Sequence, residues 1–90
     1  MCRNIRPLFN YDPPASEADM RASALQYVRK VSGFHKPSQA NEAAFERAVD
    51  DVFRATRDLL GALTTPAPPR DREAEIARLR ERSARRYGAA

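Results

Sequence analysis

The sequence predicts an all-α protein: an extended N-terminal arm, an antiparallel two-helix hairpin, and a third, C-terminal helix after a Pro-rich linker. Three observations lead to this prediction. Two long stretches repeat apolar residues at the spacing of one helix face. Ala, Arg, Glu and Leu, which favour helices, are plentiful, whereas Gly is scarce. The prolines fall outside the periodic stretches, where they cannot interrupt a helix.

Residues 1–15 form the predicted arm. Their apolar side chains are too irregularly spaced for a helix, and three prolines interrupt them. The apolar residues are Ile5, Leu8, Phe9 and Tyr11. We expect these side chains to lie across helices that form later in the chain.

The first helix is predicted over residues 17–32. Ser16 suits the N-cap, and Asp19, three residues on, can complete a capping box. Gly33 suits the residue just beyond the C-terminus, where the backbone turns left-handed. One face is apolar, with Met20, Ala24, Tyr27, Val28 and Val31.

The second helix carries the strongest periodic pattern, and it is predicted over residues 39–63. Pro37 prevents a smooth continuation of the first helix, and either Ser38 or Asn41 could cap the second. The apolar face holds Phe45, Val49, Val52, Phe53, Thr56, Leu59, Leu60 and Leu63.

The two apolar faces are expected to bury each other in an antiparallel hairpin. Met20, Val28, Phe45, Phe53 and Leu60 would form its centre. Ninety residues allow one such small core, with little apolar surface to spare.

The composition divides the chain into three parts. Residues 1–64 hold the arm and the hairpin, residues 65–70 are a stiff Pro-rich linker, and residues 71–90 hold a basic C-terminal helix and tail. This third helix is predicted over residues 71–86. Its apolar stripe is thin, with Ile76, Leu79 and Tyr87. The stripe could dock on the hairpin, pack on a second copy to form a homodimer, or meet another partner.

The positive charge is uneven. The chain has a net charge of +4, and residues 65–90 carry 7 Lys/Arg against 4 Asp/Glu. Such an excess favours an acidic partner, which could be a protein, a ribosome or a nucleic acid. The candidate partner-binding residues are Arg21, Arg29, Lys30, His35, Lys36, Arg78, Arg82 and Arg85.

Several classes of function find no support in the sequence. His35 is the only histidine, so no cluster of His and Cys could hold zinc, and we predict no metal, no cofactor and no catalytic residues. No apolar run approaches the ~18 residues of a membrane span, and none has the length of a signal peptide. We therefore expect a non-enzymatic cytoplasmic protein.

Cys2 is the single candidate for a reactive group. Removal of Met1 would leave Cys2 with a free amine and a thiol, and Arg3 and Arg6 would favour the reactive thiolate. A nucleophile also needs a base and an oxyanion site, which the sequence does not offer. The alternatives are a redox thiol acting through Cys2 and a small apolar residue that begins the arm.

Four stretches together resemble a family of short bacterial proteins that is carried as a domain of unknown function. They are MCRNIRPLFNY, PPAS, ALQYVRKVSGF and KPSQANEAAFERAV, which fall within residues 1–70. The resemblance implies a stand-alone cytoplasmic protein and brings no catalytic residues with it.

The order of elements also resembles, more distantly, the J-domain of co-chaperones. Ala15 and Ser16 stand where its first helix is capped, and a basic first helix leads to a loop and a long second helix. The loop reads His35, Lys36, Pro37 where the family has His-Pro-Asp, so the functional acid is missing. The leading hypothesis is therefore a helical interaction module. A degenerate J-domain-like chaperone regulator and a Cys2 thiol protein are the alternatives.

Overall fold

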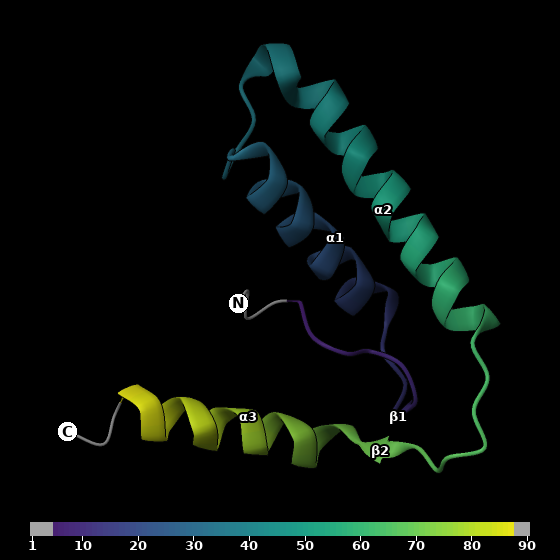
Figure 1. The fold of residues 1–90 in the computed structure, drawn as a ribbon. Helices are drawn as coiled ribbons and strands as arrows, with labels where there is room; N and C mark the ends of the chain where they lie inside the picture. The colour runs from purple at the N-terminus through teal and green to yellow at the C-terminus, as the bar shows by residue number, and fades with distance from the viewer. Residues whose placement is uncertain (1–4, 88–90) are drawn as a thin grey trace.

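Three helices make up most of the chain, which confirms the all-α prediction. The computed structural model describes residues 5–87, and side chains as far as residue 85. Within this range, the structure also contains two short strands that pair in parallel, which the sequence did not predict. In chain order (Figure 1) the elements are β1 (Tyr11–Asp12), α1 (Glu17–Ser32), a 3-10 turn (Gln39–Asn41), α2 (Glu42–Ala62), β2 (Arg70–Asp71) and α3 (Arg72–Tyr87).

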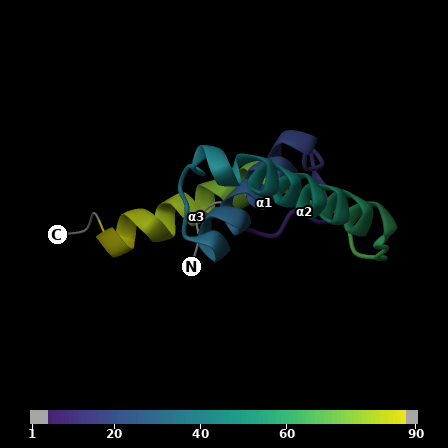
Figure 2. The ribbon, with the colours of Figure 1, turned by 90° about the horizontal axis from the view of Figure 1, so that it is seen from above.

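The helices lie in one thin layer. Helices α1 and α2 run side by side and are joined by a short connector, and α3 crosses below them (Figure 1). Turning the molecule shows how little depth it has (Figure 2), and its extents are 43 × 42 × 16 Å. The radius of gyration is 15.6 Å, against about 12 Å for a compact domain of this length. The fold therefore exposes more side-chain surface than a globular chain of the same size.

Local signals set both ends of α1, as the sequence predicts. The Ser16 hydroxyl accepts a hydrogen bond from the Asp19 N–H at 3.1 Å, and the Ser16 N–H donates to the Asp19 carboxylate at 3.0 Å. Gly33 has φ 79°, and its N–H donates to the Arg29 carbonyl at 2.9 Å. The capping box and the left-handed glycine thus place the helix ends where predicted.

Helix α2 begins three residues later than predicted. Residues 39–41 form a 3-10 turn, and neither Ser38 nor Asn41 caps a backbone N–H with its side chain. The two side chains bond to each other instead, with the Asn41 amide donating to the Ser38 hydroxyl at 2.9 Å. Because the side chains of both candidate caps bond to each other, neither caps the helix. The chain forms a 3-10 turn first, and the α-helix starts at Glu42.

The core lies between α1 and α2. Its buried members are Ala24, Val28, Val49 and Phe53. Of the predicted centre, Val28 and Phe53 are buried, whereas Met20 and Phe45 pack against the cluster partly exposed. Leu60 is half-buried and lines a surface groove.

The Pro-rich linker is folded back onto the arm. The Asn10 carbonyl accepts the Arg70 N–H at 2.8 Å, and its side-chain amide donates to the carbonyls of Ala67 at 3.4 Å and Pro68 at 3.2 Å. Asn10 has φ 65°, a left-handed conformation that asparagine tolerates better than most residues. One residue therefore joins two segments that lie far apart in the sequence.

The pairing of β1 with β2 continues this attachment. Tyr11 pairs with Arg70, and Asp12 pairs with Asp71, in parallel register. The Arg70 guanidinium lies 5.4 Å from the centre of the Tyr11 ring and donates to the Tyr11 hydroxyl at 3.3 Å. Tyr11 is thereby buried, although it belongs to a two-residue strand.

Helix α3 starts from this attachment. The Asp71 carboxylate accepts the Ala74 N–H at 3.1 Å, as an N-cap does. The next residue, Arg72, donates to the Asp19 carboxylate at 2.6 Å. The first turn of α3 is therefore tied to the first turn of α1, and the rest of α3 extends away from the hairpin (Figure 1).

Substitution of Phe53 tests the packing of the core. Phe53 is 5% exposed and is covered by the guanidinium groups of Arg21 and Arg57 at 4.3 and 5.6 Å. We expect Phe53→Ala to lower the free energy of unfolding by about 3–5 kcal/mol, since it leaves a cavity. Val31→Ala is the control, because Val31 lies on the predicted apolar face of α1 but is 73% exposed. In urea unfolding, the control should change the free energy of unfolding by about 0.5 kcal/mol or less. If both variants lost the same free energy of unfolding, the assignment of Phe53 to the core would be wrong.

Asn10 tests the attachment of the linker. Asn10→Gly keeps the left-handed backbone accessible but removes the side-chain bonds to the carbonyls of Ala67 and Pro68. Asn10→Ala removes the same bonds and adds backbone strain. We expect faster amide exchange at Ala67, Arg70 and Asp71, the residues of this segment that carry a backbone N–H, in both variants. The alanine variant should show the larger loss of stability. Unchanged exchange in both would show that the linker is held by other contacts.

Candidate functional site

An apolar groove opens between the arm, α1 and α2. Its volume is about 320 Å³, within the size range of small-molecule sites. Three of its lining residues, Arg6, Ser23 and Thr56, have polar side chains, and Tyr27 carries a hydroxyl. The apolar lining comes from Ile5, Leu8, Ala24, Tyr27, Val52 and Leu60. Among the described residues, the lining of this groove is therefore mainly apolar.

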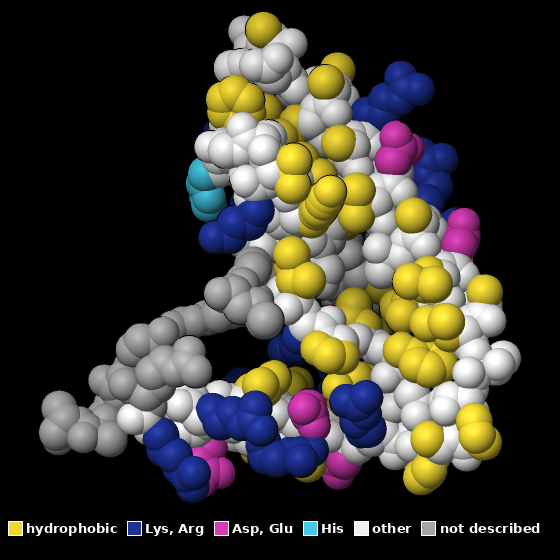
Figure 3. All heavy atoms as spheres, viewed as in Figure 1, with side chains coloured by type: hydrophobic (Ala, Val, Ile, Leu, Met, Phe, Trp, Pro, Cys, Tyr) yellow, Lys and Arg dark blue, Asp and Glu magenta, His cyan; other side chains and the backbone are white. Residues whose placement is uncertain are grey.

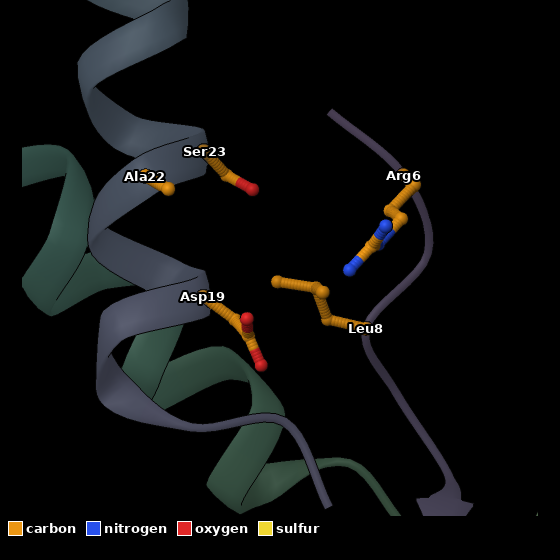
Figure 4. Close-up of a pocket in the computed structure, with 5 residues that line it drawn as sticks. All are labelled: Arg6, Leu8, Asp19, Ala22 and Ser23. Carbon is orange, nitrogen blue, oxygen red and sulfur yellow. The ribbon is translucent and has the colours of Figure 1, made fainter. Parts of the chain in front are cut away.

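A second, smaller pocket lies between the arm and the start of α1. Figure 4 shows Arg6 and Leu8 reaching from the arm toward Asp19 and Ser23 of α1. Its volume is about 90 Å³, too small for most metabolites. The pocket therefore serves as a junction, where charged groups of the arm and α1 approach each other.

Asp19 is the centre of this junction. The N–H of Ser16, donated to the Asp19 carboxylate, holds the pKa of that group below its ordinary value of 3.8, although partial burial opposes the shift. The Ser16 hydroxyl and the positive charges of Arg72 and Arg6 lower the pKa further. The carboxylate thus joins the α1 cap, the arm and the start of α3.

Two of the predicted partner-binding arginines are used within the hairpin. Arg21 donates to Asp50 at 2.8 Å and stacks on Phe53, and its hydrogen bond holds the pKa of the Asp50 carboxyl below the usual value. Arg29 donates to the carbonyl of His35 at 2.9 Å. Both arginines therefore stabilise the fold, and less of their charge is open to a partner.

The other predicted residues of the hairpin gather at its tip, which we define as residues 33–38. Lys30 precedes this tip, and His35 and Lys36 belong to it, all three with exposed side chains. Figure 3 shows the histidine beside basic side chains at the edge of the molecule. This group lies at the far end of α1 from the junction with α3 (Figure 1).

The arginines of α3 divide into paired and free side chains. Arg78 pairs with Glu75, and Arg85 pairs with Glu81. Arg82 forms no ion pair with any residue that the structure describes, and the same holds for Arg80, which the sequence analysis did not single out. The sequence could have predicted this, because neither Arg80 nor Arg82 has an acidic residue three or four positions away with which to pair.

The structure does not bring the predicted basic residues into one patch. The hairpin tip and α3 lie apart (Figure 1), and acidic side chains are interspersed with basic ones along α3 (Figure 3). Cys2 lies outside the described residues, so its reactivity stays a prediction. Within residues 5–87, no group of His, Cys, Asp and Glu is arranged to hold a metal ion. Over the same residues, no helix is long and apolar enough to cross a membrane.

One comparison with known proteins finds a matching protein family. The model of a family described as "Uncharacterized conserved protein (DUF2277)" matches residues 1–78. No curated protein and no solved structure matches the chain. The family match agrees with the resemblance read from the sequence motifs.

The junction at Asp19 gives a prediction for pH. The folded-state pKa of Asp19 is lowered, so its stabilisation is present above pH ~4 and is lost as the pH falls through the lowered value. We expect Asp19→Asn to lower the free energy of unfolding by about 1–2 kcal/mol at pH 7. The difference from wild type should shrink toward pH 2–3, as measured by urea unfolding at several pH values.

Asp58→Asn is the matched control for the loss of one carboxylate. Asp58 lies on the exposed side of α2, with its side chain 74% exposed and 3.6 Å from Arg57. Its substitution should change stability by about 0.5 kcal/mol or less. A gap between wild type and Asp19→Asn that stayed constant from pH 7 to pH 2 would contradict an electrostatic role for this carboxylate.

Proposed function

The chain belongs to this uncharacterised conserved family, and we propose that it is a non-enzymatic helical interaction module whose α3 binds an acidic protein partner. The single observation that carries the proposal is that α3 is hydrogen-bonded to the rest of the fold at its first turn and is mostly exposed beyond it. The Arg72 guanidinium donates to Asp19 of α1, and the adjoining strand β2 pairs with β1. Such an arrangement suits a helix that serves as a contact surface.

The exposed length of α3 is amphipathic. Ile76 is half-buried and Leu79 is 39% exposed, so an apolar stripe is only partly covered. At 100° per residue, the unpaired Arg80 and Arg82 fall on opposite flanks of this stripe. A partner helix with an apolar face and acidic edges would match both features, as in helix-in-groove recognition.

The charge pattern favours a protein over a nucleic acid. Phosphate binding favours an unbroken row of basic side chains, whereas Glu75 and Glu81 neutralise Arg78 and Arg85. An apolar stripe would contribute nothing to a phosphate backbone. Stacking of bases also needs several aromatic side chains, and α3 contains a single aromatic residue, Tyr87.

Capture from a lysate of the native host tests the proposal. Immobilised wild-type chain is compared with the double variant Arg80→Glu/Arg82→Glu, before and after nuclease treatment. We expect a captured protein that survives nuclease, weakens at least tenfold in the double variant and is released by raised salt, because exposed charges are screened.

The matched control is Lys36→Glu/Arg47→Glu. It makes the same change in net charge at two exposed positions, one in the hairpin tip and one on α2. Capture should be close to wild type in this control. Equal losses in both double variants would show that only net charge matters, and capture abolished by nuclease would favour a nucleic acid; either result contradicts the proposal.

A further inference from the structure

The chain exposes more surface than a compact monomer. Its accessible surface is 7128 Å² for a mass of 10.1 kDa, whereas a folded monomer of that mass exposes about 5,300 Å². The excess of about 1,800 Å² exceeds the roughly 800 Å² per partner that a standard protein interface buries. The chain therefore leaves more surface open than a compact monomer of its mass does.

The apolar part of this surface includes a second face of α2. Helix α2 packs on α1 through Val49 and Phe53, and Phe45, Ala48 and Val52 contact the same core from its edge while staying partly exposed. About a quarter of a turn away, another set of apolar residues follows the alternating three- and four-residue spacing of a coiled-coil seam. The seam, as we call it, consists of Phe45, Ala48, Val52, Ala55, Leu59 and Ala62.

The C-terminal half of the seam is open to solvent, whereas Phe45, Ala48 and Val52 in its N-terminal half are partly buried. Leu59 is 56% exposed, Ala55 and Ala62 are exposed, and neighbouring Leu63 is 42% exposed. Figure 3 shows hydrophobic side chains gathered along α2 on the face toward the viewer, with charged side chains at its outer edge. A soluble helix normally buries such a stripe against another helix.

The seam is complementary to itself in the antiparallel direction. Large residues alternate with alanine, in the order Phe, Ala, Val, Ala, Leu, Ala. If a second α2 runs antiparallel and is centred between Val52 and Ala55, Phe45 meets Ala62 of the second copy. In the same register Ala48 meets Leu59, and Val52 meets Ala55. Every large side chain then faces a methyl group, so the two helices can approach closely without overpacking.

We propose that two copies of this chain form a two-fold symmetric dimer in which the α2 seams pack antiparallel. Each surface patch in such a dimer is its own partner, so one sequence pattern is sufficient for both sides. An unrelated helix would need to supply the same alternation of large and small residues by itself. The acidic residues beside the seam are each near an arginine, Asp51 with Arg54 at 3.7 Å and Asp58 with Arg57 at 3.6 Å, which reduces repulsion between copies. The dimer leaves α3 outside the interface, so it is independent of the function proposed above.

Sedimentation velocity on the full chain tests the dimer. Wild type should sediment at twice the monomer mass and dissociate on dilution. Ala55→Glu places a carboxylate at the centre of the seam and should raise the dissociation constant at least a hundredfold. Ala43→Glu is the matched control, since Ala43 is an exposed alanine of α2 outside the seam, and it should stay dimeric. Circular dichroism checks that both variants remain helical.

Cysteine cross-linking tests the antiparallel register separately. In a Cys2→Ser background, Ala48→Cys with Leu59→Cys should give a disulfide-linked dimer on mild oxidation, because these positions face each other across the proposed axis. Ala43→Cys with Arg54→Cys has the same separation on the charged side of α2 and should give far less. A wild-type chain that stays monomeric at its highest soluble concentration overturns the proposal. So does a dimer that Ala55→Glu leaves intact, or equal cross-linking in the two pairs.

Discussion

The packing of Phe53 against α1 is the contact on which the rest of the structure depends. It places a large ring among Ala24, Val28 and Val49, and two guanidinium groups cover its outer side. Because Ala24 is small, the two helices can approach closely at this point. The arm and α3 attach to the platform that this pair of helices forms, and the linker attaches to the arm.

The attachments of α3 and of the linker are mainly polar and depend on very few residues. Asp19 uses one carboxylate to bind the α1 backbone and Arg72, and Asn10 uses its backbone and its amide to bind the linker. Such bonds fix direction better than apolar contacts do, because hydrogen bonds are directional. A small chain can in this way orient its third helix without a second hydrophobic core.

The thin layer of helices also separates the surfaces available for binding. Helix α3 offers a narrow apolar stripe between two unpaired arginines, whereas α2 offers a wider apolar face on which large and small residues alternate. These surfaces differ in charge and in shape, so they suit partners of different kinds. A dimer through α2 would present two copies of α3, which would strengthen binding to any partner that holds two matching segments.

The sequence by itself determined the helices and most of their ends. Ser16, Asp19 and Gly33 act within one helical turn, and periodicity identified Val28 and Phe53 as core residues, so both could be predicted from local rules. The separation of paired from free arginines on α3 was also present in the sequence as i,i+3 and i,i+4 spacing.

Only the tertiary structure decided how the segments attach to one another. Asn10 and Pro68 are 58 residues apart, and Asp19 and Arg72 are 53 apart, so no local pattern relates them. It also decided which part of the wide apolar face of α2 meets α1 and which part stays exposed. The reason is physical: periodicity shows that a face is apolar, but how far a neighbouring helix covers it depends on packing between helices, which local spacing does not record.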